Sequence, residues 1–196
     1  APPKGRVIKV ASVNELFAAV ENVRLGGTIS LAPGRYNISR RVGIKTDRVT
    51  LRGATGNRND VIIDGDGIGE LVAFTACSDV TVADLTIQNA KWNGFKIDSE
   101  TGVQRLRIYN CVIRNIWQRG VKGVIVPEKD REKTQPRDCR VEYCLFYNDR
   151  AKKFSDDEAD TPKNFNGNYV GGIDVMYAKG WTISDNVFLN IQGRTR

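Results

Sequence analysis

The sequence predicts an all-β protein: a parallel β-helix whose coils each carry three short strands. Three observations lead to this fold: a ten-residue pattern occurs four times, segments of alternating apolar residues fill most of the chain, and one amphipathic helix precedes them. Repeats that differ mainly in the loops between them are typical of stacked solenoids. The four copies align without a gap and each ends in Asn: VTVADLTIQN (80–89), LRIYNCVIRN (106–115), CRVEYCLFYN (139–148) and WTISDNVFLN (181–190).

Residues 11–26 predict the helix that caps the first coil. Ser12 is placed to act as N-cap, and Glu15, three residues later, completes a capping box. Gly26 follows the helical pattern and is expected to end it. Because the terminal repeat of a solenoid needs a cover, we expect this helix to close the open core of the first coil. Its predicted apolar face is formed by Leu16, Phe17 and Val20.

The coils are expected over residues 27–190. Inside each repeat, apolar residues recur at every second position, and this alternation breaks once near the centre. Such a break marks a turn that joins two strands whose apolar sides both face the core. Four further strands precede the first repeat: 28–31, 35–38, 48–53 and 61–67. Ala-Pro-Gly separates the first two, and Gly or Asp closes each of the last two.

A third strand precedes each repeat, so that equivalent strands of successive coils pair in parallel about 4.8 Å apart. Two long loops, 127–138 and 149–169, flank the sheet that these third strands form. Long polar loops on a tight scaffold are functional or disordered, and the composition of these two allows both interpretations. The third strands are predicted at 70–74, 94–98, 120–124 and 172–176.

The length of the chain and its two ends bear on its organisation. A chain of 196 residues is expected to form one domain, here 1–196, around one core. It begins at Ala1 without Met, which favours a removed signal peptide or tag. It ends at Arg196, directly after a complete repeat. We therefore expect further coils of a longer chain, or a partner chain, to cover the last coil.

The charge of the chain narrows the classes of binding partner that we expect. The net charge is +7 and the sequence pI is about 9.3. A basic protein attracts acidic polysaccharide, nucleic acid or anionic membrane, although a solvated surface rich in Lys would give the same numbers. No apolar run approaches the roughly 18 residues of a membrane span. The basic residues also lack the stripe with interleaved aromatic residues of nucleic-acid binders. Acidic polysaccharide is the partner that we expect.

The chain has no His, which excludes a Ser-His-Asp triad, a Cys-His dyad and a His-ligated metal. Its four cysteines lack the paired spacing of a zinc site. Cys111 and Cys144 occupy the same position in adjacent repeats, where either a disulfide or two stacked thiols would fit. Cys139 falls in an apolar column and is expected in the core.

With these features, residues 27–190 resemble the right-handed parallel β-helix of the pectin-lyase-like superfamily. The resemblance is carried by the helical cap before GTISLAPGRY, by the stretch LRGATG…VIIDGDG and by the four Asn-ended repeats. It implies a carbohydrate-active protein of polysaccharide-lyase type in a secreted or periplasmic location. It does not select one enzyme, because the same fold hosts hydrolases, epimerases, tailspikes and adhesins. The asparagine ladder of that family is matched here by Asn186 but not by Leu85, Cys111 and Cys144.

The resemblance also implies a chemistry that works without His. In such lyases a Lys or Arg removes the proton α to a uronate carboxyl, while Ca²⁺ or an Arg neutralises that carboxylate. A lysine base requires neighbouring cations that lower its pKa. Strand alternation points Lys96, Lys122 and Asp174 out of one sheet, roughly 5 Å apart per coil. We therefore predict Lys96 or Lys122 as the base and Arg119 as the carboxylate partner; an ordinary surface ladder is the alternative.

Other side chains near this column complete the predicted site. Asp98 and Asp174 are the predicted ligands of a Ca²⁺ ion. Trp92, Trp117 and Tyr177 are predicted either to stack on sugar rings or to pack against turns. The leading hypothesis is a polysaccharide lyase that cleaves a uronate-containing polysaccharide by β-elimination. The alternative is a non-catalytic glycan-binding or surface-structural β-helix.

Overall fold

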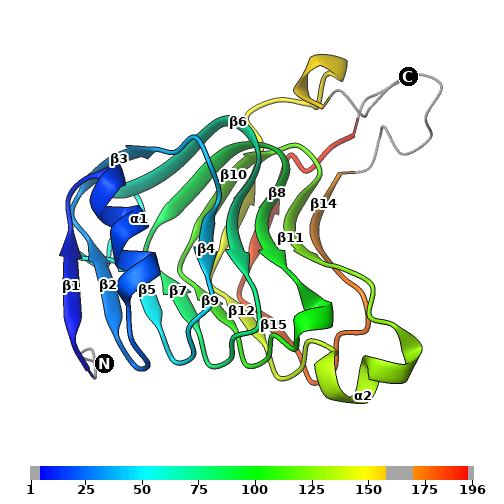
Figure 1. Ribbon diagram of the computed structural model, residues 1–196. Helices are drawn as coiled ribbons and strands as arrows, with labels where there is room; N and C mark the ends of the chain where they lie inside the picture. Colours follow the sequence, from blue (N-terminus) through cyan, green and yellow to red (C-terminus); the bar gives the residue numbers. More distant parts are fainter. Residues whose placement is uncertain (1–4, 158–169, 194–196) are drawn as a thin grey trace.

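Parallel strands stacked coil upon coil form the framework of the protein in a computed structural model, which describes residues 5–157 and 170–193 (Figure 1). Within these residues, seven strands make one parallel sheet, which we call sheet A. Its central, core-facing positions stack in register as Ile8, Ile29, Leu51, Val82, Ile108, Val141 and Ile183. In order across the sheet, its strands are β1 (Val7–Val10), β2 (Thr28–Leu31), β5 (Thr50–Gly53), β7 (Thr81–Ala83), β9 (Arg107–Tyr109), β12 (Arg140–Glu142) and β15 (Thr182–Ser184).

The remaining nine described strands form sheet B, which bends around the coil and supplies its other two sides. The bend occurs inside β6 and β8, each of which runs continuously through both sides. The predicted parallel β-helix is thus confirmed, except that β6 and β8 fuse two of the expected short strands. The strands of sheet B are β3 (Gly34–Asn37), β4 (Val42–Ile44), β6 (Val61–Phe74), β8 (Thr86–Ile97), β10 (Val112–Ile116), β11 (Arg119–Gly123), β13 (Leu145–Tyr147), β14 (Gly171–Val175) and β16 (Val187–Leu189).

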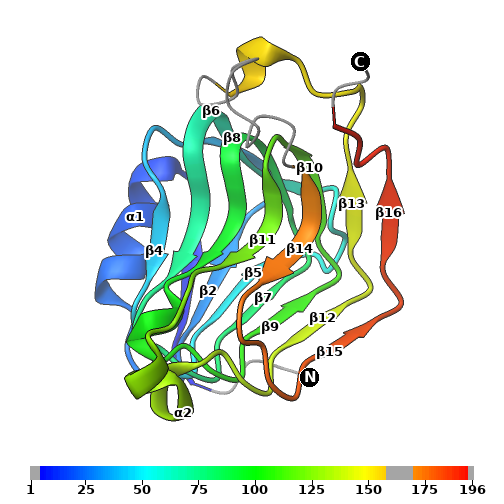
Figure 2. The ribbon, with the colours of Figure 1, turned by 90° about the vertical axis from the view of Figure 1, so that its right-hand side faces the viewer.

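One side of sheet B carries the predicted site, and we call its outer surface the front face. It consists of β4, the second halves of β6 and β8, β11 and β14, which lie side by side in Figure 2. The loop predicted at 127–138 contains η2 (Glu128–Asp130) and α2 (Arg131–Thr134), which lie below this face in Figure 2. The other predicted loop contains η3 (Phe154–Asp156) above the face, and its residues 158–169 lie outside the described part of the chain. A further short helix, η1 (Ser99–Thr101), follows β8.

The capping helix α1 (Val13–Asn22) covers the first coil beside β4 (Figure 2). The predicted N-cap forms, because the Ser12 hydroxyl accepts a hydrogen bond from the Glu15 amide at 3.3 Å. The Glu15 carboxylate in turn accepts from the Ala11 amide at 2.6 Å. The helix is shorter than the predicted 11–26, since Val23 already has extended backbone angles. Leu16, Ala19 and Val20 bury the apolar side of the helix against the coils.

Residues with positive φ recur at equivalent turns and fix the path of each coil. The turn that leaves sheet A places Asp84, Asn110, Tyr143 and Asp185 in this conformation. Asn and Asp tolerate left-handed backbone better than most residues, which explains their frequency there. At the next position of the same turn, the Asn186 side chain bonds both the Cys144 amide (2.9 Å) and the Val141 carbonyl (2.8 Å). Asn186 thus serves as the one predicted ladder asparagine.

The core is apolar along the stack and holds all four cysteines as buried free thiols. The two open alternatives for Cys111 and Cys144 therefore resolve to stacked thiols in this structure.

At the last described coil, the core-facing Ile183 and Phe188 are 51% and 49% exposed. In the described residues, no helix has the length and apolar character that crossing a membrane requires.

Candidate functional site

The predicted column of outward side chains forms on the front face. In register across β4, β6, β8, β11 and β14 stand Gly43, Ala73, Lys96, Lys122 and Asp174. Strand alternation directs them away from the core, since their neighbours are buried in β4, β6, β8 and β11 and pack half-buried against the core in β14. The two lysines are therefore adjacent and the aspartate follows on the next coil.

Asp174 anchors one end of this column. Its Oδ2 atom accepts hydrogen bonds from Lys122 Nζ and from Arg119 Nε, both at 2.9 Å. Burial alone would raise the pKa of Asp174, but these two cations outweigh it and hold the pKa below its ordinary value. The carboxylate is thus kept ionised between two positive side chains.

Arg119 lies beneath the column instead of on the surface. Its side chain is only 2% exposed, and it also donates to the Gln118 carbonyl at 2.9 Å. Burial lowers the pKa of this guanidinium, although Asp174 acts in the opposite direction. Strand alternation breaks just after Arg119, because Gly120 and Val121 both face the core, and Arg119 thus lies on the same side of the sheet as Asp174. In this structure Arg119 is buried against Asp174, and its role as the carboxylate partner of a substrate stays a prediction.

Lys96 belongs to a second ionic cluster that the sequence did not predict, centred on Glu70 of β6. Lys96 Nζ lies 3.4 Å from Glu70 Oε1, which also accepts from Asn93 Nδ2 at 3.2 Å. The other Glu70 oxygen pairs with Arg41 at 2.8 Å. Asp98 lies 3.8 Å from the same lysine nitrogen. Lys96 is thus flanked by two carboxylates, but at longer distances than the contact of Lys122 with Asp174.

The two predicted calcium ligands are not brought together. Asp98 follows β8 and accepts a hydrogen bond from Thr75 Oγ1 at 2.7 Å, on the side of the preceding coil. Asp174 stands two coils beyond Lys96 and is engaged by cations. Across residues 5–157 and 170–193, no three His, Cys, Asp or Glu side chains gather closely enough to hold a metal ion. Calcium prefers six or more oxygen ligands, so this pair does not fit the ion.

The three predicted sugar-stacking residues lie at the two ends of the front face. Trp92 is 44% exposed and donates from its ring nitrogen to Asp157 at 3.3 Å. Trp117 is 7% exposed, and the Arg150 guanidinium covers it, with its carbon 4.3 Å from the centre of the Trp117 ring. Tyr177 is likewise covered by a guanidinium, that of Arg131, at 3.9 Å. Of the three, Trp92 has the largest surface available to a ligand.

The segment before residue 158 forms a fixed wall at the Trp92 end. Lys152 and Asp157 make an ion pair of 3.2 Å in which both side chains are buried. Asp157 also accepts from Gln118 Nε2 at 2.6 Å, which ties the segment to the start of β11. The front face is therefore bordered at this end by residues 152–157, whose short helix η3 lies above the face in Figure 2.

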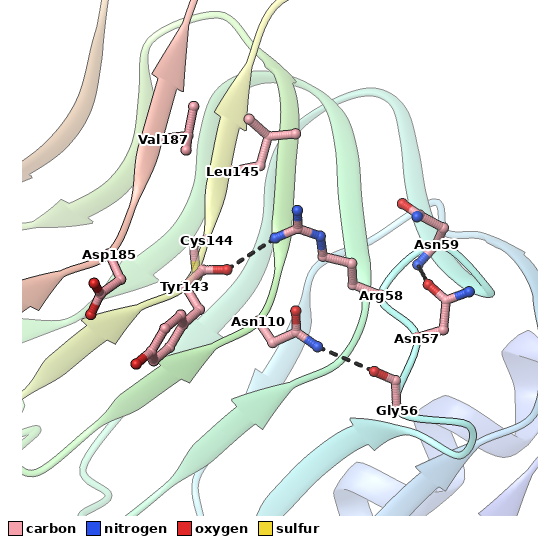
Figure 3. Close-up of a pocket in the computed structure, with 10 residues that line it drawn as sticks. All are labelled: Gly56, Asn57, Arg58, Asn59, Asn110, Tyr143, Cys144, Leu145, Asp185 and Val187. Atoms are coloured by element: carbon pink, nitrogen blue, oxygen red, sulfur yellow. Dashed lines mark hydrogen bonds between the residues drawn. The ribbon is translucent and has the colours of Figure 1, made fainter.

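A different hollow of about 440 Å³ lies away from the front face, beside β13 and β16 (Figure 3). Residues 56–59 cross over several coils there, where Arg58 donates to the Tyr143 carbonyl at 3.0 Å. Asn110 donates to the Gly56 carbonyl at 3.2 Å. These polar groups therefore fasten the crossing segment to the coils. None of them belongs to the front face.

The fold is similar to that of an alginate lyase of known structure. The chain is similar to the structure of the family PL6 alginate lyase AlyGC, with a TM-score of 0.61 and 12% identity over 97% of this chain. It spans 29% of the length of that protein. An alginate lyase from Paenibacillus sp. str. FPU-7 gives a TM-score of 0.48 and 15% identity, over 94% of this chain and 76% of that one. A family PL6 polysaccharide lyase from Pseudopedobacter saltans gives 0.35 and 15%, over 95% and 47% respectively. No protein-family model matches the sequence, and no curated protein matches it either.

Proposed function

We propose that the protein is a polysaccharide lyase of the pectin-lyase-like superfamily that cleaves a uronate-containing polysaccharide by β-elimination, outside the cytoplasm. The observation that carries this proposal is the adjacent pair Lys96 and Lys122 on the outer surface of a polysaccharide-lyase fold. A fold alone does not determine an activity. The lysine pair supplies the missing element, because β-elimination at a uronate needs a base next to a group that stabilises negative charge.

Lys96 is the base in this proposal. Its contacts to Glu70 and Asp98 are 3.4 and 3.8 Å, whereas Lys122 is held to Asp174 at 2.9 Å, so Lys96 is the more easily released toward a substrate. In its unprotonated form, the Lys96 amine takes the proton from C5 of the uronate, and the electron pair forms the C4–C5 double bond. The C4–O bond breaks, the leaving oxygen takes a proton from water, and the hydroxide that remains takes the proton from the Lys96 ammonium, which restores the base.

Lys122 holds the uronate carboxylate while negative charge develops on it. A preorganised cation at that point stabilises the transition state, because it need not reorient during the reaction. Asp174 and Arg119 fix its position through the 2.9 Å contacts on Oδ2. Arg119 is thus a positioning residue in this scheme. We derive no step through calcium, and its requirement stays a prediction.

Release of unsaturated uronate product tests the proposal. The protein is incubated with alginate, pectate or glycosaminoglycan, and the ultraviolet absorbance of the new double bond is followed, with and without a calcium chelator. Lys96→Gln should lower the rate by about 100-fold or more, the usual contribution of a general base. Lys9→Gln, on the exposed face of β1, removes the same charge far from the site and should leave the rate unchanged. Absence of product from every polysaccharide would overturn the proposal.

Binding of glycan without turnover is the second candidate function. The observation in its favour is that Lys96, Lys122 and Arg119 all contact carboxylates of the protein itself. A binding surface needs charge but no released base. The two functions separate in one comparison: a binding protein retains polysaccharide and forms no product.

A further inference from the structure

A second hollow, of about 450 Å³, lies where α1 meets the first strand of the front face. Its floor includes Gly43 of β4 and Ala73 of β6, the two small residues that begin the outward column. A methyl group built on Gly43 would meet no atom within 4 Å, so the space above the floor is open. Figure 2 shows α1 beside β4 at this edge of the sheet.

The walls of this hollow are mainly basic. Arg40, Arg41 and Lys45 line it, and Glu21 of α1 is the acid among the lining residues. The Arg40 guanidinium lies over the Phe17 ring at 4.0 Å and contacts Glu21 at 3.4 Å. A flat floor under positive walls suits a sugar ring that carries a carboxylate, since the cations can meet the acid while the ring rests on the floor.

The hollow lies beside the proposed active site on the same face. Gly43, Ala73 and Lys96 stand in one register row on successive coils, about 4.8 Å apart. Arg41 lines the hollow and also pairs with Glu70, which contacts Lys96. A ligand lying across the strands from Lys96 toward α1 would therefore enter this space.

We propose that the hollow between α1 and β4 is a distal subsite that binds a uronate unit of the same polysaccharide chain whose reacting unit lies at Lys96. The inference rests on the proposed function for the identity of that chain. Lys45 and Arg40 hold the carboxylate of the distal unit, and its ring lies over Gly43. The subsite would give the protein a preference for long oligouronates over short ones.

Filling the floor tests this subsite. Gly43→Val places a strand-compatible side chain in the hollow, and Lys45→Gln removes one of its cations without changing its shape. Lys9→Gln on β1 is the matched charge control. Each change is made in the Lys96→Gln background to prevent turnover, and calorimetry measures the binding of saturated three-unit and six-unit oligouronates. Thermal unfolding confirms that each variant is folded.

We expect Lys45→Gln to weaken binding of the six-unit ligand about tenfold, the usual effect of losing a hydrogen bond to a charged group. Gly43→Val should weaken it because its side chain occupies the space of the sugar ring. Binding of the three-unit ligand and the Lys9→Gln control should not change. Equal six-unit binding by all variants, or no binding by any, would overturn the subsite. If binding depends on the hollow but the native protein forms no product, the lyase proposal fails and the subsite stands. If product forms and length preference survives Gly43→Val, the subsite fails and the lyase proposal stands.

Discussion

Lys96 and Lys122 stand in register on adjacent coils, yet each contacts a different carboxylate. Lys96 Nζ lies 3.4 Å from Glu70, which belongs to the preceding coil, and Lys122 Nζ lies 2.9 Å from Asp174, on the following coil. The two lysines occupy equivalent positions in the regular backbone. Their partners differ because the coil before Lys96 supplies Glu70 and the coil after Lys122 supplies Asp174. The pair is therefore asymmetric, with one lysine held closely and the other loosely, as the two different roles in the proposed mechanism require.

Replacing Asp174 with Asn should make the free energy of unfolding less dependent on pH in the acid range. The cations around Asp174 outweigh the effect of burial and keep the pKa of its carboxyl below the ordinary 3.8. Because the unfolded chain regains the ordinary value, the ionised group stabilises the fold above that pH, and this stabilisation is lost as the pH falls through the lowered pKa. In urea titrations we expect D174N to be the less stable protein near pH 7 and the two proteins to converge near pH 2.

The exposed Asp66, replaced by Asn, is the control for this comparison. Its variant should follow the native protein at both pH values. A stability loss in D174N that is the same at neutral and acid pH would contradict the expectation. It would show that the side chain acts through packing and not through its charge.

Asp157→Ala should destabilise the protein far more than Asp79→Asn, in which Asn tolerates the left-handed backbone of Asp79. Asp157 pairs with Lys152 where the two side chains are 1% and 0% exposed, whereas the Asp79 pair with Arg105 is 41% and 46% exposed. Removing one partner of a buried pair leaves an uncompensated charge and costs about 3–5 kcal/mol. An exposed pair contributes about 0–1 kcal/mol. Urea unfolding of both variants measures the difference, and equal losses would show that water reaches the 152–157 pair.

The fold could be predicted because its signal is repeated. Each coil places apolar residues at alternate positions, and the stacked set Val82, Ile108 and Val141 follows directly from aligning the repeats. The outward direction of Lys96 and Lys122 follows from the same rule. Local alternation is thus sufficient for the coil, for its core and for the column on the front face.

The ionic partners could not be predicted in the same way. Glu70 meets Lys96 because β6 shifts register twice between Asp64 and Glu70, and such irregularities leave no clear pattern in the sequence. Arg119 could not be placed by alternation, because the next two residues, Gly120 and Val121, both face the core. The separation of Asp98 from Asp174, by contrast, is contained in the predicted register, since Asp98 follows Lys96 on β8 and Asp174 lies two coils further on.

The cysteines should resist alkylation in the folded protein. Burial raises the pKa of Cys77 to about 12 and that of Cys139 to about 11, so few thiolates exist near pH 8. All four side chains are also inaccessible. We expect iodoacetamide to label none of them without denaturant and all four in urea without a reductant, as read by mass spectrometry. Two labels in urea would instead show that Cys111 and Cys144 form a disulfide.

Gly120→Ala should destabilise the protein, whereas Gly43→Ala should not. A methyl group at Gly120 would lie 2.6 Å from the Gly172 carbonyl oxygen and 2.6 Å from the Phe146 ring. At Gly43, by contrast, it would meet no atom within 4 Å. Overpacking of this kind costs about 1–3 kcal/mol, and substitutions at open surface positions stay within about 0.5 kcal/mol.

Urea midpoints of the two alanine variants provide the measurement. Gly94 stacks on Gly120 in the same way, with a would-be methyl group 2.7 Å from the Gly120 carbonyl oxygen. Gly94, Gly120 and Gly172 therefore allow β8, β11 and β14 to approach one another closely at the start of the front face. Gly120 also makes room for the Phe146 ring of the core. If Gly120→Ala were as stable as Gly43→Ala, the coils would have to separate there without cost. The close stacking that sets Lys96 beside Lys122 would then owe nothing to the glycines, and the pairing of the flanking strands would have to fix it alone.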